Sequence, residues 1–133
     1  MNLNLTKMQG TGNDYIFANL LDVGDSEIFD EMNWSQMAIR LSDRHFGIGS
    51  DGLIFICPSD IADCRMRMFN ADGSEGAMCG NGIRCLGKYV YERSLIKKTV
   101  ICVETMAGIR TLYLDIENEN HVRFVSVDMG IPI

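Results

Sequence analysis

A single cysteine set among glycines is the part of this sequence best suited to chemistry. Residues 70–85 read N-A-D-G-S-E-G-A-M-C-G-N-G-I-R-C, and Cys79 stands directly before the G-N-G run. Apolar residues at positions 83, 86 and 90 then share one helical face, so we expect a helix to begin at or just after Cys79. The first N–H groups of a helix lack partners and carry partial positive charge, which favours an anion such as a carboxylate. Glycine leaves these donors accessible because it has no Cβ to obstruct a ligand.

The thiol of Cys79 would share the field of that helix start. A cysteine at a helix N-terminus has its pKa lowered from ~8.5 toward neutrality, so thiol and thiolate exchange readily. Nucleophilic attack would need a nearby base, and nothing in the sequence ties the one plausible candidate, His45, to Cys79. Proton transfer at a carbon beside a carboxylate needs only the thiol and the helix start, which stabilises the developing charge. We therefore favour proton transfer, with a buried structural cysteine in a glycine-rich turn as the alternative.

Length and charge narrow the class of protein. A chain of 133 residues suits a single domain spanning residues 1–133, and 47% apolar with 23% charged residues is typical of a soluble globular protein. No apolar run approaches the ~20 residues that span a bilayer. The 12 basic and 18 acidic residues give a net charge of −6, which argues against nucleic acid or an anionic membrane as a partner. An anionic small molecule remains compatible, because it would respond to local donors.

The cysteines indicate free thiols in a reducing compartment. Their number is odd, none are spaced C-x-x-C, and the N-terminus is too polar for a signal peptide, so we expect a cytoplasmic protein without disulfides. Zinc would need clustered Cys and His ligands, and the chain has only two histidines. We expect no metal. The five cysteines are Cys57, Cys64, Cys79, Cys85 and Cys102.

Strand-like and helix-like patterns alternate along the chain. The residues 118–120, N-E-N, suit a hairpin turn between the last two strands. Such short connections leave no room for parallel crossovers, so we expect an α+β fold with a mostly antiparallel sheet. Strands are expected at residues 3–8, 15–20, 53–57, 64–69, 99–104, 109–116 and 122–127, and helices after residue 33 and from about residue 80.

A G-x-G-x-x-G pattern at residues 47–52 suggests a dinucleotide site but is in the wrong context. The pattern binds pyrophosphate when a strand precedes it and a helix follows. Here the expected helix comes before the glycines and the expected strand after them. We therefore interpret these glycines as shaping a tight loop.

Three segments together resemble diaminopimelate epimerase. They are M-Q-G-T-G-N-D-Y at residues 8–15, R-H-F-G-I-G-S-D-G at 44–52, and the stretch from F-N-A-D-G-S-E at 69–75 through M-C-G-N-G-I-R-C at 78–85. Their order and spacing match, and the likeness covers the whole chain. It implies interconversion of LL- and meso-2,6-diaminopimelate, on the bacterial route to lysine and peptidoglycan, without pyridoxal phosphate or metal. It also implies a fold of two similar halves, each a curved sheet wrapped around a central helix, with the substrate between them.

The resemblance assigns roles to individual residues. Cys79 matches the first catalytic cysteine, which moves the α-proton on one face of the substrate. Gly80 and Asn81 match the backbone donors that hold the α-carboxylate. Asn13 and Asn70 match two asparagines that contact substrate, for which amides suit because they both donate and accept. The alternative for each asparagine is a turn residue that bonds its own backbone.

Other motif residues are given structural roles. We expect Cys85 to pack in the core, and Arg44 and His45 to organise the loop before Gly47. At Gly52 some family members carry a glutamine that reaches the substrate, and that contact is absent here.

The chain resembles only the N-terminal half of the family. Epimerisation needs an acid and a base on opposite faces of the α-carbon, and the family takes its second cysteine, and an arginine for the distal carboxylate, from a second half. We therefore expect this chain alone to bind diaminopimelate weakly or not at all and not to turn it over. It could pair with a separate second half, or with another copy of itself through a partly apolar surface.

Two rival functions remain open. One is another isomerase of the same superfamily, such as a proline racemase or a phenazine-biosynthesis-type isomerase, although the motifs around Asn13 and Asn70 disfavour both. The other is a non-catalytic binding or structural module that retains the fold. The reactivity of Cys79 toward alkylation separates the second rival from an epimerase half.

Overall fold

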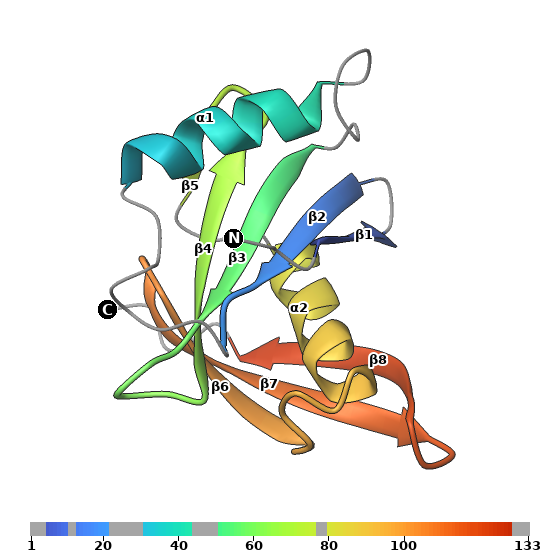
Figure 1. The fold of residues 1–133 in the computed structure, drawn as a ribbon. Coiled ribbons are helices and arrows are strands. Elements are labelled where there is room, and N and C mark those ends of the chain that lie inside the picture. The colour runs from blue at the N-terminus through green and yellow to red at the C-terminus, as the bar shows by residue number, and fades with distance from the viewer. Residues whose placement is uncertain (1–4, 11–12, 22–30, 44–50, 77–79, 129–133) are drawn as a thin grey trace.

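A computed structural model describes residues 5–10, 13–21, 31–43, 51–76 and 80–128, and Figure 1 shows their arrangement. Within these ranges no helix is long and apolar enough to cross a membrane. The elements are β1 (Leu5–Gly10), β2 (Asn13–Asn19), α1 (Glu31–Ser42), β3 (Gly52–Cys57), β4 (Cys64–Asn70), β5 (Glu75–Gly76), α2 (Gly80–Glu92), β6 (Val100–Thr105), β7 (Gly108–Glu117) and β8 (His121–Asp128).

The strands form one mixed sheet. Its order is β1-β2-β3-β4-β6-β7-β8, with β5 paired to β4. The expectation that parallel crossovers would have no room is wrong, because β2 pairs with β3 in parallel and β4 pairs with β6 in parallel. The two helices make these crossovers possible, since α1 lies between β2 and β3 in the chain and α2 between β4 and β6. The remaining pairs are antiparallel, and the fold class is α+β as expected.

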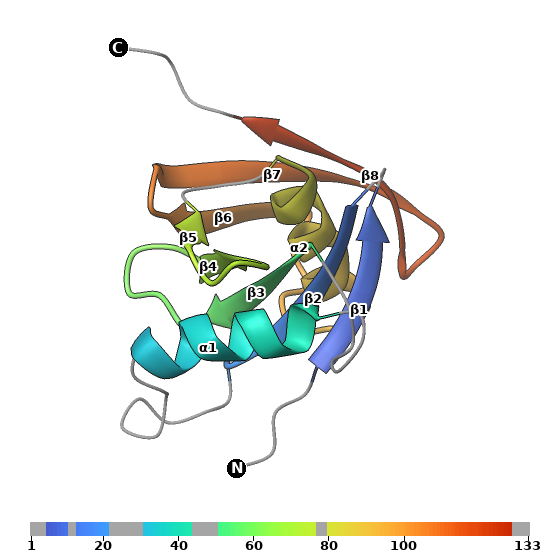
Figure 2. The ribbon, with the colours of Figure 1, turned by 90° about the horizontal axis from the view of Figure 1, so that it is seen from above.

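The two faces of the sheet are covered by different helices. Every residue of β3 is buried, with Leu53 and Phe55 on the side of α1 and Ile54 and Ile56 on the side of α2. Such a run of apolar residues is typical of a strand covered on both faces. Helix α2 contacts β1 and β2 as well as β7 and β8, and Figures 1 and 2 show the sheet curving so that strands from both its ends lie beside this helix.

Helix α2 approaches the sheet closely at a glycine. Ile83, Leu86 and Val90 are fully buried, which confirms the helical face read from the sequence. Gly87 lies on the same side, where an added Cβ would be 3.0 Å from Leu112 Cδ1 and 3.5 Å from Val125 Cγ1. The missing side chain lets the helix lie against β7 and β8.

Two cysteines are part of the core. Cys57 and Cys64 are buried and have free thiols, and they face opposite sides of the sheet, Cys57 toward α1 and Cys64 toward α2. Burial is the main cause that raises the pKa of Cys57 from 9.0 to about 11. Burial likewise raises the pKa of Cys64 to about 12, with a contribution from the charge of Asp63. Both thiols therefore stay protonated in the folded protein at neutral pH.

The hairpin turn expected at residues 118–120 is present between β7 and β8. Asn118 has a positive φ of 61°, a conformation that asparagine tolerates better than most residues. The two strands pair in antiparallel register, with an irregularity between Asp115 and Ile116. Strand β5 was not expected, because two residues carry no readable alternation.

Enlarging Gly87 should show how tightly α2 packs. We expect Gly87→Val to lower the free energy of unfolding by about 1–3 kcal/mol, because the extra methyl groups would displace Leu112 and Val125. Gly87→Ala is the matched control, because its better helix propensity, worth about 1 kcal/mol, offsets a single tight contact. Urea unfolding measures both variants, and equal stability of the valine variant and the parent would contradict the packing argument.

The buried thiols should make stability fall in alkali. A thiol with a pKa of 9.0 when unfolded and about 11 or about 12 when folded binds its proton more tightly in the folded state. Its contribution is complete below pH 9 and is lost as the pH rises above it, by up to about 1.4 kcal/mol per pH unit and thiol. Urea unfolding at pH 8, 9 and 10 measures this slope. We expect Cys64→Ala to be less stable at pH 8 but to show a shallower slope, and an unchanged slope would contradict the assignment.

Candidate functional site

Residues from three sequence motifs meet at one end of the sheet. Asn13 is the first residue of β2, Gly52 is the first of β3, and Asn70 is the last of β4. Gly52 pairs with Tyr15 on one side and with Asn70 on the other. The parallel pairing of β2 with β3 is what brings their starts to the same end. Only the backbone of Asn13 lies among the described residues.

A pair of aspartates ties the starts of β2 and β3 together. The backbone N–H of Asp51 donates to the carbonyl of Asp14 at 2.8 Å, and the N–H of Asp14 donates to Asp51 Oδ2 at 2.8 Å. Lys7 Nζ lies 3.9 Å from Asp14 Oδ2. These contacts hold the chain directly after Asn13. These contacts were not expected from the sequence. The signal for them was that Asp14 directly follows Asn13 and Asp51 directly precedes Gly52, both within the motifs.

Asn70 opens a tight turn between β4 and β5. Its backbone N–H donates to the Ser74 carbonyl at 2.7 Å, and Gly73 N–H donates to the Asn70 carbonyl at 2.9 Å. Its side-chain Nδ2 donates to Ser74 Oγ at 3.1 Å. Gly73 has a φ of +90°, which explains why a glycine stands in the turn. The amide of Asn70 is half-buried and takes part in its own turn, which is the structural role considered for it.

Helix α2 begins at Gly80, as expected from the sequence. Gly80 and Asn81 are half-buried and form its first two positions, where the N–H groups have no partner within the helix. The first turn carries no acidic residue. Instead, the guanidinium of Arg84 reaches back, so that an added Cβ at Gly80 would lie 3.3 Å from Arg84 Nη1. The helix start is therefore positive from both the backbone and a side chain, which suits an anion.

Several residues named from the sequence lie outside the described ranges. They include Cys79, Arg44 and His45, so the position of the thiol at the helix start stays a prediction. Its two flanks are described: β5 ends at Gly76 and α2 begins at Gly80.

Gly52 and Cys85 have clear structural settings. An added Cβ at Gly52 would lie 2.9 Å from the backbone oxygen of Phe69, so a glutamine here would require β3 to shift against β4. Cys85 is half-buried and packs against the core between the sheet and α2, as expected.

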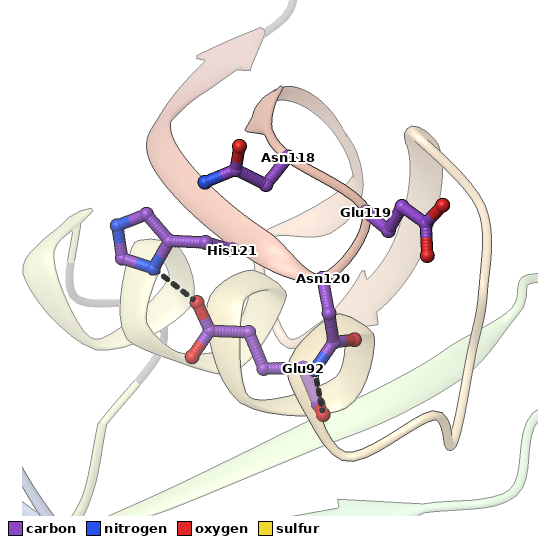
Figure 3. A pocket seen from close by; sticks show the side chains of 5 residues that line it. All are labelled: Glu92, Asn118, Glu119, Asn120 and His121. Atoms are coloured by element: carbon purple, nitrogen blue, oxygen red, sulfur yellow. Dashed lines mark hydrogen bonds and ion pairs between the residues drawn. The ribbon is translucent and has the colours of Figure 1, made fainter.

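An open pocket of about 580 Å³ lies at the other end of α2 (Figure 3). There His121 Nδ1 is 3.3 Å from Glu92 Oε2, and Asn120 Nδ2 donates to the Glu92 carbonyl at 3.3 Å. Glu92 follows Gly80 by twelve residues in a helix, a distance of about 18 Å. The residues that line the pocket therefore do not include Asn70, Gly80 or Asn81, which the sequence assigned to the substrate. Among the residues with described positions, no group of three or more His, Cys, Asp and Glu could hold a metal ion.

Comparisons with known proteins agree on the family. The family model described as diaminopimelate epimerase matches residues 5–133. A diaminopimelate epimerase of Agathobacter rectalis is 58% identical over 131 residues, which is 98% of this chain and 44% of the relative. One of Acetivibrio thermocellus is 53% identical over 133 residues, again 98% of this chain and 44% of the relative. The chain thus spans less than half the length of these relatives.

Solved structures share the fold at low identity. A hydroxyproline epimerase from Agrobacterium vitis, solved with bound trans-4-hydroxy-L-proline, has a TM-score of 0.75 at 17% identity, covering 94% of this chain and 40% of that one. A methylitaconate-delta-isomerase has a TM-score of 0.70 at 19% identity, covering 91% of this chain and 36% of that one. These likenesses concern the fold alone. The sequence matches, together with the motif residues gathered where β2 and β3 begin, show that the chain belongs to the diaminopimelate epimerase family.

Proposed function

We propose that this chain supplies one half of the active site of a pyridoxal-phosphate-independent diaminopimelate epimerase. The observation that carries the proposal is the meeting of Asn13, Asn70 and the pairing partner Gly52 at one end of the sheet. Membership of the family supplies the substrate, 2,6-diaminopimelate. The relatives are about twice as long as this chain, so the second half of the site would come from residues beyond those matched here.

The proposed mechanism is proton transfer by Cys79 on one face of the α-carbon. The N–H groups of Gly80 and Asn81 would hold the α-carboxylate at the start of α2, with the guanidinium of Arg84 nearby. As the α-proton leaves, negative charge grows on the carboxylate oxygens, and donors fixed in place beforehand stabilise that charge. A thiol with a pKa near the working pH suits the exchange of one proton.

The second face of the substrate requires a second acid or base. We propose that it belongs to the half absent from this chain, so that the chain alone is inactive.

We also propose that α2 is the central helix of the half-domain and that the protein works in the cytoplasm with reduced thiols. Another copy of the chain is a less favoured partner than the second half.

A non-catalytic module is the second candidate, and one observation favours it. The side-chain amide of Asn70 donates to Ser74 Oγ within its own turn, which is the contact that a purely structural asparagine would make. On that reading the thiol of Cys79 would show no special reactivity. A proline racemase-like isomerase would share the reactive thiol and differ in substrate, whereas a phenazine-biosynthesis-type isomerase would lack the thiol.

The proposal expects Cys79 to be the fastest thiol. With iodoacetamide at pH 7.5, we expect Cys79 to be labelled at least tenfold faster than any other cysteine, and Cys57 and Cys64 last, because burial raises their pKa to about 11 and about 12. Peptide mass spectrometry over time gives each rate. Cys79→Ser should remove only the fast phase, and uniform slow labelling of the parent would favour the module.

Joining the chain to a second half should restore turnover. In the joined protein, this chain would replace the matched 131 residues of the Agathobacter rectalis relative. Epimerisation of LL-diaminopimelate would be measured as exchange of its α-proton in deuterium oxide. We expect the joined protein to be active. Cys79→Ala should lower its activity at least about a thousandfold, because the variant lacks a catalytic group. Cys102→Ser on β6 should change the activity little. Exchange catalysed by the 133-residue chain alone would contradict the half-site proposal.

A further inference from the structure

An arginine is buried beneath the turn that carries Asn70. Arg67 lies on β4 with 8% of its surface exposed, on the face covered by α1. Its guanidinium carbon is 4.5 Å from the centre of the Trp34 ring and 5.4 Å from that of the Phe69 ring. A buried charge is costly unless it is paired and hydrogen-bonded, so Arg67 requires an anionic hydrogen-bond acceptor close to it.

Glu75, on the far side of the turn, is a charged partner of Arg67. Arg67 Nε donates to Glu75 Oε2 and Arg67 Nη2 donates to Glu75 Oε1, each at 2.8 Å. Two parallel hydrogen bonds between a planar guanidinium and a carboxylate fix the orientation of both groups. The aromatic rings of Trp34 and Phe69 hold the guanidinium plane in turn.

This ion pair secures a strand that is otherwise weakly held. Strand β5 consists of Glu75 and Gly76 and pairs with β4 through Phe69 and Met68. So short a strand has few ladder hydrogen bonds, and a slip of one residue would turn its side chains to the opposite face. The Arg67–Glu75 pair opposes that slip.

What the pair fixes is the geometry of the turn that precedes β5. This turn runs from Asn70 to Ser74 and is closed by the bond from Asn70 N–H to the Ser74 carbonyl. An added Cβ at Gly76 would lie 3.7 Å from Asn70 Nδ2, so β5 itself borders the Asn70 amide.

We propose that Arg67 is a positioning residue: through Glu75 it fixes the turn that presents Asn70. What the site binds rests on the function proposed above, whereas the positioning rests on the contacts of Arg67 and Glu75 alone. In this proposal Arg67 takes no part in proton transfer.

Amide hydrogen exchange of the 133-residue chain tests the positioning. Arg67→Lys keeps the charge but cannot form both hydrogen bonds, and Glu75→Gln keeps the shape but removes the charge. We expect each variant to speed exchange at the N–H groups of Asn70 and Gly73 at least tenfold while β7 and β8 stay protected. The double variant should show less than the sum of the two single effects, because both changes break the same pair.

The exposed pair of Arg123 and Asp115 provides the matched control. Arg123 Nη2 lies 2.5 Å from Asp115 Oδ2, the Arg123 side chain is 59% exposed, and its guanidinium carbon is 5.6 Å from the Phe124 ring centre. Arg123→Lys repeats the chemistry of Arg67→Lys at an exposed position. It should change neither exchange in the turn nor the fluorescence of Trp34, the single tryptophan, whereas Arg67→Lys should change both.

Unchanged exchange at Asn70 and Gly73 in Glu75→Gln would overturn the proposal, and so would a uniform loss of protection across the sheet in that variant. If Arg67→Lys does not fold, Glu75→Gln alone decides. The alkylation rate of Cys79 should change at least threefold in both variants and not in Arg123→Lys. Slow labelling of Cys79 in the parent would count against the proposed function, while the exchange rates would still decide the positioning.

Discussion

Burial of β3 and β4 on both faces is the constraint on which the rest of this fold depends. A strand such as β3, with six consecutive buried residues, needs a helix on each side of it. The helices α1 and α2 meet that need, and the chain passes through each of them to reach the next strand of the sheet. Parallel pairing of β2 with β3 and of β4 with β6 follows from these passages. The site end of the sheet follows as well, because parallel pairing brings the starts of β2 and β3 together.

Helix α2 has ends of different character. At its C-terminal end, Lys97 Nζ donates to the Tyr91 carbonyl at 3.3 Å and also to Asn120 Oδ1, and Asn120 donates to the Glu92 carbonyl. Carbonyl groups that the helix leaves free are thus satisfied by side chains of the following loop and hairpin. The N-terminal end has a half-buried glycine and asparagine and no acidic side chain. The N-terminal end lies next to the family's motif residues, and its N–H groups favour an anion.

The core treats its polar groups in two ways. Cys57 and Cys64 are kept neutral, because burial raises the pKa of each thiol well above neutrality. Arg67 cannot be neutralised, so it is held by a carboxylate and two aromatic rings. The first solution needs only an apolar setting. The second links α1, β4 and β5, of which the backbone ladder joins only β4 and β5.

The sequence by itself determined the local features: the strands with buried runs, the turn around Asn118, the helix start at Gly80 and the apolar face of α2. These depend on residues a few positions apart, so spacing is enough to read them. Only the tertiary structure decided that β2 and β4 each have a parallel neighbour, since strand order depends on how helices cover a sheet. The same holds for the carboxylate of Asp51 on the N–H of Asp14, and for Arg67 between Trp34 and Glu75. Charges of that kind look like ordinary surface residues in a sequence, and only packing shows that they are buried or paired.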